Sequence, residues 1–249
     1  MAPTIDKEKL KEFEEIQKER QEYVKNVGIE YRFGCYEEKR ADSCHLLGEY
    51  FEAIEQNFKK SLELFRDNCE KKEYPKSCYK YAMYLLSGKE CVPSFEKMIK
   101  PLEIACNGKI PLGCRYLGLV YWNGDEKQQP NSKKAENAMK RACELEDADA
   151  CWMLSTWYLG PQAKFISPKG EKKDKKTGQL ERNPEKALEF GIRACEMNIP
   201  QACANVSRMY RIGDGIPKNP DKAKEYVDKA TEIIEILKSK QSTPGFTGS

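Results

Sequence analysis

Cysteines recur in pairs along this chain, and their spacing constrains the fold more than any other feature. The two members of a pair are separated by eight residues in the first two pairs and by seven in the other three. The first cysteines of successive pairs lie 34, 37, 37 and 52 residues apart. A period of 34 to 37 residues is typical of stacked helix pairs, so we predict an α-solenoid. Ten of the eleven cysteines lie on this lattice: Cys35 and Cys44, Cys69 and Cys78, Cys106 and Cys114, Cys143 and Cys151, and Cys195 and Cys203.

Each repeat contains two helical patterns. Helix A begins near the second cysteine of a pair, and helix B ends at the first cysteine of the next pair. The third residue after the second cysteine is apolar, the fourth is small and the seventh is large. These three positions share one helix face. Glycines three residues further on predict the ends of three A helices, at Gly88, Gly124 and Gly213. The repeated positions are Leu47, Gly48 and Phe51; Tyr81, Ala82 and Leu85; Leu117, Gly118 and Tyr121; Leu154, Ser155 and Tyr158; and Val206, Ser207 and Tyr210.

The flanks and one insertion depart from this pattern. Residues 1–34 predict a capping helix and linker, in which Lys and Glu surround an apolar stripe and Gly28 and Gly34 break the helix before Cys35. The repeats are expected over 35–231, and 232–249 should hold the end of a C-terminal capping helix and a disordered tail. The fourth repeat is longer within 161–183, where Lys, Gly and Pro predict a mobile loop or, alternatively, a functional lid. Pro101 predicts a kink or a late start in the second B helix.

Composition excludes several classes of protein. Charged residues make up 33% of the 249 residues and the net charge is only +3, with no basic stripe among aromatics, so nucleic acid is not an expected partner. The sequence contains no run of 18 apolar residues, so no membrane span is predicted. The first twenty residues lack the apolar segment of a signal peptide, and they are too rich in Glu for a matrix presequence.

The cysteine spacing favours disulfides over metal or redox chemistry. Zinc sites use two to four residues between paired ligands, and redox sites of thioredoxin type use C-x-x-C. A lattice pair instead joins the last turn of one helix to the first turn of the next, where Cα atoms lie near disulfide distance. Each bridge would contribute roughly 2.5 kcal/mol by loop entropy. Cys91 is outside the lattice and is expected to be a free thiol. Oxidised pairs without a cleaved presequence predict the mitochondrial intermembrane space.

Candidate functional residues are few. His45, the single histidine, is expected to be a half-exposed helix residue, with a metal or haem ligand as the alternative. No metal site and no catalytic set is predicted. Positions one, five and eight residues after the A-helix cysteine face away from the packed stripe, and concave solenoid surfaces bind partners. The predicted partner surface comprises Tyr79, Trp122, Trp152, Arg208 and Arg211; the alternative is that these side chains pack against neighbouring A helices.

The repeat motif resembles a known family. CRYLGLVYWNG at Cys114–Gly124 and CANVSRMYRIGDG at Cys203–Gly215 are similar to the Sel1-like repeat, a TPR-like helix pair. The paired cysteines resemble the cysteine-rich Sel1-repeat proteins, which include secreted bacterial β-lactamase-like forms and a mitochondrial form. The chain is more similar to the mitochondrial form, from about Tyr31 to Tyr226. SCYKYAMYLLSGK at Ser77–Lys89 and CYEEKRADSC at Cys35–Cys44 carry that similarity.

This resemblance implies a fold and a function. The fold is a right-handed α-α superhelix of five disulfide-stapled Sel1-like helix pairs. The function is assembly of respiratory complex IV in the intermembrane space, through binding of protein clients. We therefore expect a non-catalytic scaffold, with no cofactor and a monomeric state favoured. The alternatives are haem binding, thiol–disulfide oxidoreductase activity, and the β-lactamase-like activity of the bacterial relatives.

Overall fold

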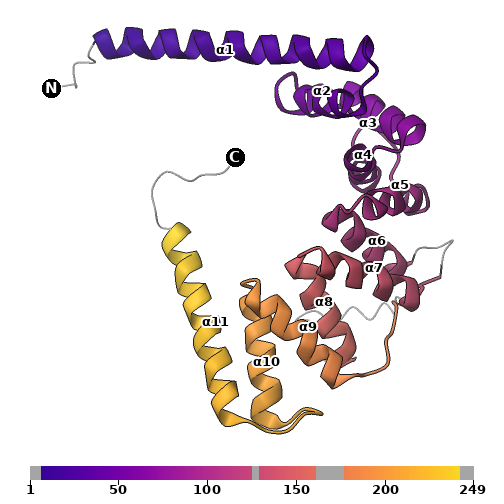
Figure 1. The fold of residues 1–249 in the computed structure, drawn as a ribbon, viewed down its shortest axis with the longest axis vertical. Coiled ribbons are helices and arrows are strands. Elements are labelled where there is room, and N and C mark those ends of the chain that lie inside the picture. The colour runs from indigo at the N-terminus through magenta and orange to yellow at the C-terminus, as the bar shows by residue number, and fades with distance from the viewer. Residues whose placement is uncertain (1–6, 125–128, 161–176, 242–249) are drawn as a thin grey trace. The chain divides into compact units, whose positions relative to one another are not determined.

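The computed structural model describes residues 7–124, 129–160 and 177–241, and Figure 1 shows the path of the chain. Within these residues the chain forms eleven α-helices and no β-strand, which confirms the prediction of an all-α, helix-pair solenoid. After α1, the A helices are α2, α4, α6, α8 and α10, and the B helices are α3, α5, α7, α9 and α11. The bounds are α1 Lys7–Tyr36, α2 Ala41–Ala53, α3 Phe58–Lys72, α4 Pro75–Ser87, α5 Phe95–Asn107, α6 Pro111–Asn123, α7 Ser132–Glu144, α8 Ala148–Leu159, α9 Pro184–Glu196, α10 Pro200–Ile212 and α11 Pro220–Gln241.

The helices form two compact units, one ending at Ser94 and the other beginning at Phe95. In the first unit α2 packs between α1 and α3, and α3 packs against α4. In the second unit each helix from α5 to α11 packs against the next one in sequence. Packing between nearest neighbours along the chain is the defining property of a solenoid, because no central core is shared by distant elements.

A helices lie close to B helices at the predicted small residue. A Cβ atom at Gly48 would meet the Phe65 ring at 2.5 Å, and one at Gly118 would meet Met139 at 2.8 Å. In α8 and α10 a serine occupies the same position, and its hydroxyl donates to a B-helix carbonyl. Ser155 Oγ lies 2.7 Å from the carbonyl oxygen of Ala187, and Ser207 Oγ lies 2.6 Å from that of Ala223. The predicted stripe is buried in all five A helices, as expected for this close approach.

The helix ends follow local sequence rules. The predicted end residues Gly88, Gly124 and Gly213 follow α4, α6 and α10 and have φ of 70°, 56° and 73°. Positive φ is tolerated there because glycine has no Cβ. Four of the five B helices begin with a cap that the sequence analysis missed, in which an asparagine side chain accepts a hydrogen bond from the backbone N–H three residues later. These asparagines are Asn57, Asn131, Asn183 and Asn219.

Helix α1 contradicts the predicted break at Gly28 and Gly34, because it continues through both residues to Tyr36. The glycines serve close packing instead. A Cβ at Gly28 would meet the Tyr50 ring of α2 at 2.5 Å, and one at Gly34 would meet Ser43 Oγ at 2.4 Å. The absence of a side chain therefore lets the last turns of α1 lie directly on α2.

Pro101 lies inside α5, which begins six residues earlier at Phe95, so the predicted late start is wrong. A proline in a helix interior removes one backbone donor. Pro101 is buried, so its ring also contributes apolar surface to the packing of this helix.

Each loop enclosed by a cysteine pair contains one non-glycine residue with left-handed backbone. Their φ values lie between 49° and 67°. Such a conformation costs roughly 1 kcal/mol for an ordinary residue. It lets the chain reverse between α1 or a B helix and the next A helix within a few residues, so the two helix ends remain adjacent. The residues are Lys39, Glu73, Lys109, Glu146 and Asn198.

The close A–B approach generates a prediction about stability. Gly48→Ala should lower the free energy of unfolding by about 1–3 kcal/mol, because the fully buried Phe65 ring cannot move away from the added methyl group. Gly118→Ala is the matched variant and should cost less, since the flexible Met139 side chain can adjust. Thermal unfolding monitored by circular dichroism at constant redox state measures both. A larger loss in Gly118→Ala would contradict this account of the small position.

Candidate functional site

The five lattice pairs all lie at bonding distance. Their Cα–Cα distances are 4.4 to 4.8 Å, and each pair joins the end of one helix to the start of the next. The ten cysteines have no more than 5% of their surface exposed. Cys91 is not among the bonded cysteines, and its Sγ donates to the carbonyl oxygen of Tyr84 at 3.4 Å.

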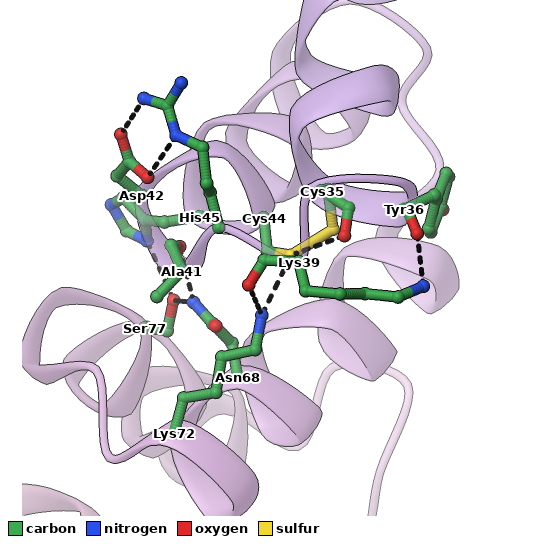
Figure 2. Close-up of a disulfide and its surroundings, with 11 residues drawn as sticks. Cys35, Tyr36, Lys39, Ala41, Asp42, Cys44, His45, Asn68, Lys72 and Ser77 are labelled. Atoms are coloured by element: carbon green, nitrogen blue, oxygen red, sulfur yellow. Dashed lines mark hydrogen bonds and ion pairs between the residues drawn. A yellow bond between two sulfur atoms is a disulfide. The ribbon is translucent and has the colours of Figure 1, made fainter.

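The first cysteine pair has a lysine beside it. Figure 2 shows Lys72 of α3 reaching the loop between Cys35 and Cys44. Its Nζ donates to the carbonyl oxygen of Lys39 at 2.7 Å and lies 3.6 Å from Cys44 Sγ. An ammonium group at this distance would stabilise a Cys44 thiolate if the bond were reduced. The sulfurs themselves are buried, so an external thiol reaches them only if the surrounding helices open.

Next to this pair lies a buried polar network centred on Ser77. Asn68 Nδ2 donates to Ser77 Oγ at 2.8 Å, and Ser77 Oγ lies 3.1 Å from His45 Nδ1 (Figure 2). The second ring nitrogen, Nε2, lies 3.7 Å from a Glu49 carboxylate oxygen. Because the Glu49 carboxylate can only accept, we assign the imidazole proton to Nε2, which leaves Nδ1 to accept a hydrogen bond from the Ser77 hydroxyl.

His45 is 6% exposed, so the expectation of a half-exposed residue is wrong. Sequence spacing could not show this, because the partner Ser77 is 32 residues away in the chain. Rings of Phe65 and Tyr74 lie 5.5 and 5.6 Å from the imidazole centroid and complete its enclosure. With both nitrogens facing protein groups, His45 does not fit the role of a haem ligand.

Ser77 contacts His45, and His45 contacts Glu49, which is the order of nucleophile, base and orienting acid in a hydrolytic triad. Sequence reasoning found no such set. Ser77, however, is fully buried, so a substrate carbonyl cannot approach its oxygen. The network therefore joins α2, α3 and α4 rather than forming a hydrolytic site. Within the described residues, no cluster of three or more His, Cys, Asp or Glu side chains could hold a metal ion.

Burial lowers the pKa of His45, because the charged imidazolium loses solvation. Glu49 opposes this effect, while the ammonium groups of Lys80 and Lys76 lower the pKa further. The folded protein therefore holds a neutral imidazole at a pH where an exposed histidine would begin to take up a proton.

Two tyrosines of the A-helix stripe donate hydrogen bonds to B-helix carboxylates. Tyr158 OH donates to Glu136 at 2.5 Å, and Tyr121 OH donates to Glu103 at 2.8 Å. Burial, followed by the neighbouring carboxylate, raises the pKa of Tyr121 to about 12 and also raises that of Tyr158. Both phenols therefore stay protonated at neutral pH and fix adjacent helices to one another.

The five predicted partner residues have different surroundings. Tyr79 is half-buried on α4 in the first unit. In the second unit, Trp152 on α8 is half-buried, and its indole N–H is buried without an acceptor among the described residues. Arg208 on α10 lies 3.4 Å from Asp214, and Arg211 is exposed. Their role in binding a partner stays a prediction.

Trp122 is packed against two other parts of the chain. Its ring stacks on Trp157 with centroids 3.7 Å apart and planes 4° apart. The Gly178 backbone N–H donates to the Trp122 carbonyl oxygen at 2.7 Å, and a Cβ on Gly178 would meet the indole at 2.6 Å. The end of the inserted segment thus packs on α6, which the sequence did not indicate. Residues 161–176 of the predicted mobile loop, which spans 161–183, lie outside the described residues.

Comparisons with known proteins agree with this fold. The Sel1 repeat family model matches residues 41–66, 75–97, 111–147, 176–199 and 200–232. Cytochrome c oxidase assembly factor 7 of Xenopus tropicalis is 34% identical over 99% of both chains. Its homolog of Drosophila melanogaster is 33% identical over 90% of this chain and 92% of its own. The crystal structure of a Sel1 repeat protein from Oxalobacter formigenes superposes with a TM-score of 0.62 at 16% identity, covering 89% of this chain and 83% of that one, which shows the fold alone.

None of the helices in the described ranges is long and apolar enough to cross a membrane.

The buried imidazole predicts a loss of stability in mild acid. Unfolding exposes His45 and returns its pKa to about 6.5. The neutral imidazole therefore makes its full contribution to the free energy of unfolding above about pH 6.5. That contribution is lost as the pH falls toward the lower pKa of the folded state. Asp67 and Glu136 have pKa values below their ordinary ones, so their effect begins at lower pH.

The test compares melting temperatures at about pH 7.5 and 5.5, on either side of the ordinary histidine pKa. His45→Asn keeps an acceptor for Ser77 but does not titrate there, so it should lose less stability between the two pH values than the parent protein. Equal losses in the two proteins would show that His45 does not cause the effect.

Proposed function

Because the chain belongs to the Sel1 repeat family and, within it, to the group of cytochrome c oxidase assembly factor 7, we propose that it acts in assembly of cytochrome c oxidase. In this role it is a disulfide-stabilised scaffold that binds a protein client. The observation that carries the proposal is similarity over whole chains, with 34% identity across 99% of both this chain and the Xenopus tropicalis relative. Similarity over a single repeat would support only the fold.

The chemistry of the described residues supports binding rather than catalysis. Ser77 and His45 are enclosed, and the buried tyrosines remain protonated donors at neutral pH. A solenoid with its polar groups committed to helix packing acts through its surface. The proposal therefore assigns no catalytic residue.

We propose the mitochondrial intermembrane space as the location. Disulfides persist in oxidising compartments and are rare where thiol buffers keep cysteines reduced. Five cysteine pairs at bonding distance support such a compartment, and the proposed role in cytochrome c oxidase assembly supports the mitochondrion.

The proposed client surface in the second unit lies on α8 and α10. Arg211 is exposed, and Arg208 and Trp152 are partly so, which gives an aromatic group and two cations for a partner. Trp and Arg are enriched among residues that carry binding energy. Trp122 is a weaker member, because Trp157 already occupies one face of its ring.

A second candidate is thiol–disulfide exchange at Cys35–Cys44. The observation that favours it is Lys72, whose ammonium group would stabilise Cys44 as a leaving thiolate. Burial of both sulfurs opposes it. The ease with which Cys35–Cys44 is reduced, compared with the other four pairs, distinguishes the two candidates.

Alkylation of the native protein followed by non-reducing mass mapping should find five bridges and one modified cysteine, Cys91. Two or more alkylated lattice cysteines would contradict the structural role. For the second candidate, a glutathione buffer should reduce Cys35–Cys44 before the other pairs, and Lys72→Met should slow that step. Uniform resistance of all five pairs would exclude it.

Cells that lack the protein test the client surface by complementation. Trp152→Ala and Arg211→Ala should reduce assembled cytochrome c oxidase on native gels while changing the melting temperature little. The control is Leu154→Ala on the buried face of the same helix, which should cost about 2–5 kcal/mol of stability. A Trp152→Ala protein that melts as early as Leu154→Ala would show that Trp152 belongs to the packing rather than to the surface.

A further inference from the structure

The amino-terminal half of α1 presents an apolar stripe that nothing in its own unit covers. Leu10, Phe13, Ile16 and Tyr23 are 47%, 59%, 53% and 70% exposed. The sequence predicted that this segment is part of a capping helix with one apolar stripe. In the structure only the carboxyl-terminal part of α1 packs on α2, and Figure 1 shows the rest extending beyond it.

The exposed stripe continues a face that already binds a helix. Positions Phe13, Gln17, Arg20, Val24, Val27 and Tyr31 follow one another at spacings of three and four, so they share one side of α1. Tyr31 packs on the Cys44–Leu47–Phe51 cluster of α2, and Gly28 lies against Tyr50. This side of α1 therefore packs on α2 near the carboxyl-terminal end of α1. Near the amino-terminal end of α1 the same side is exposed. A surface of this shape accommodates a second helix.

The charges around the stripe argue against a lipid surface. Membrane-binding amphipathic helices are rich in Lys and Arg on the polar face. Residues 7–25 of α1 contain six basic and six acidic side chains, so the segment has no net attraction for anionic headgroups. Balanced charge of both signs instead suits a protein partner that carries the same mixture.

The arrangement of these charges is self-complementary. Glu12 and Arg20 lie four residues before and four residues after Ile16, on the same side of the helix. If two copies of α1 lie antiparallel with the two-fold axis at Ile16, each Arg20 faces Glu12 of the other copy, and the two Ile16 side chains meet. Lys9 then faces Tyr23 of the other copy, where a cation can lie over the ring.

We propose that the occupant of this stripe is a second copy of the chain, joined through antiparallel pairing of the α1 helices. The contact is isologous, so one surface serves both partners and the assembly closes at two copies. The exposed part of α1, residues 7–23, is about 25 Å long. A pair of helices of that length buries less than the roughly 1,600 Å² of a standard interface, so the dimer is weak and depends on protein concentration. The monomer favoured from the sequence is then the state at low concentration.

Sedimentation analysis from low micromolar to near-millimolar protein tests the pairing. The full chain should show a reversible monomer–dimer equilibrium. Phe13→Glu should raise the dissociation constant by at least about tenfold, because it removes an apolar side chain beside the central Ile16 pair and places a second carboxylate opposite Glu19 of the other copy. Val92→Glu is the matched control, since Val92 is 83% exposed and lies outside α1, and it should leave the equilibrium unchanged. A monomer at every concentration, or a dimer unaffected by Phe13→Glu, would overturn the proposal.

Charge exchange tests the antiparallel alignment with substitutions that preserve helix propensity. Arg20→Glu and Glu12→Arg should each weaken the dimer, since each places like charges opposite one another. The double variant restores opposite charges across the contact and should recover the affinity of the parent chain. Failure to recover would exclude this pairing. Binding of the parent chain to phospholipid vesicles, abolished by Phe13→Glu and without dimer formation, would assign the stripe to a lipid surface and overturn the proposal.

Discussion

Close approach of each A helix to its B helix at one small residue is the constraint on which the repeats depend. Glycine at this position lets Phe65 or Met139 pack on the A-helix backbone, and serine there donates to the carbonyl of Ala187 or Ala223. The large residues three positions further on can then be buried beside the contact. A larger side chain at the small position would separate the helices and expose the stripe, so the spacing of three, four and seven residues has a direct steric cause.

The features that depend on residues close together in the sequence could be predicted. Helix order, the buried stripes and the terminal glycines all follow from spacings within about ten residues. His45 was not predictable in this way, because its enclosure depends on Ser77 and Phe65 from other helices. The stack of Trp122 on Trp157 likewise joins residues one repeat apart.

The two glycines of α1 show why a residue type alone can mislead. Gly28 and Gly34 were interpreted as helix breakers, since glycine lowers helix stability in isolation. In the structure the loss is offset by packing of the helix on Tyr50 and Ser43, which no larger residue would permit. Whether a glycine ends a helix or allows contact with a neighbour depends on tertiary structure.

Pairing of each cysteine with the next one on the lattice bears on how the chain acquires its bonds. Ten cysteines admit hundreds of connectivities, and most of them require shuffling before the native one is reached. Here every bridge closes a loop of about ten residues that lies between consecutive helices. An oxidant can therefore form each bond as soon as its own short segment is accessible, and no bond has to wait for cysteines of a later repeat.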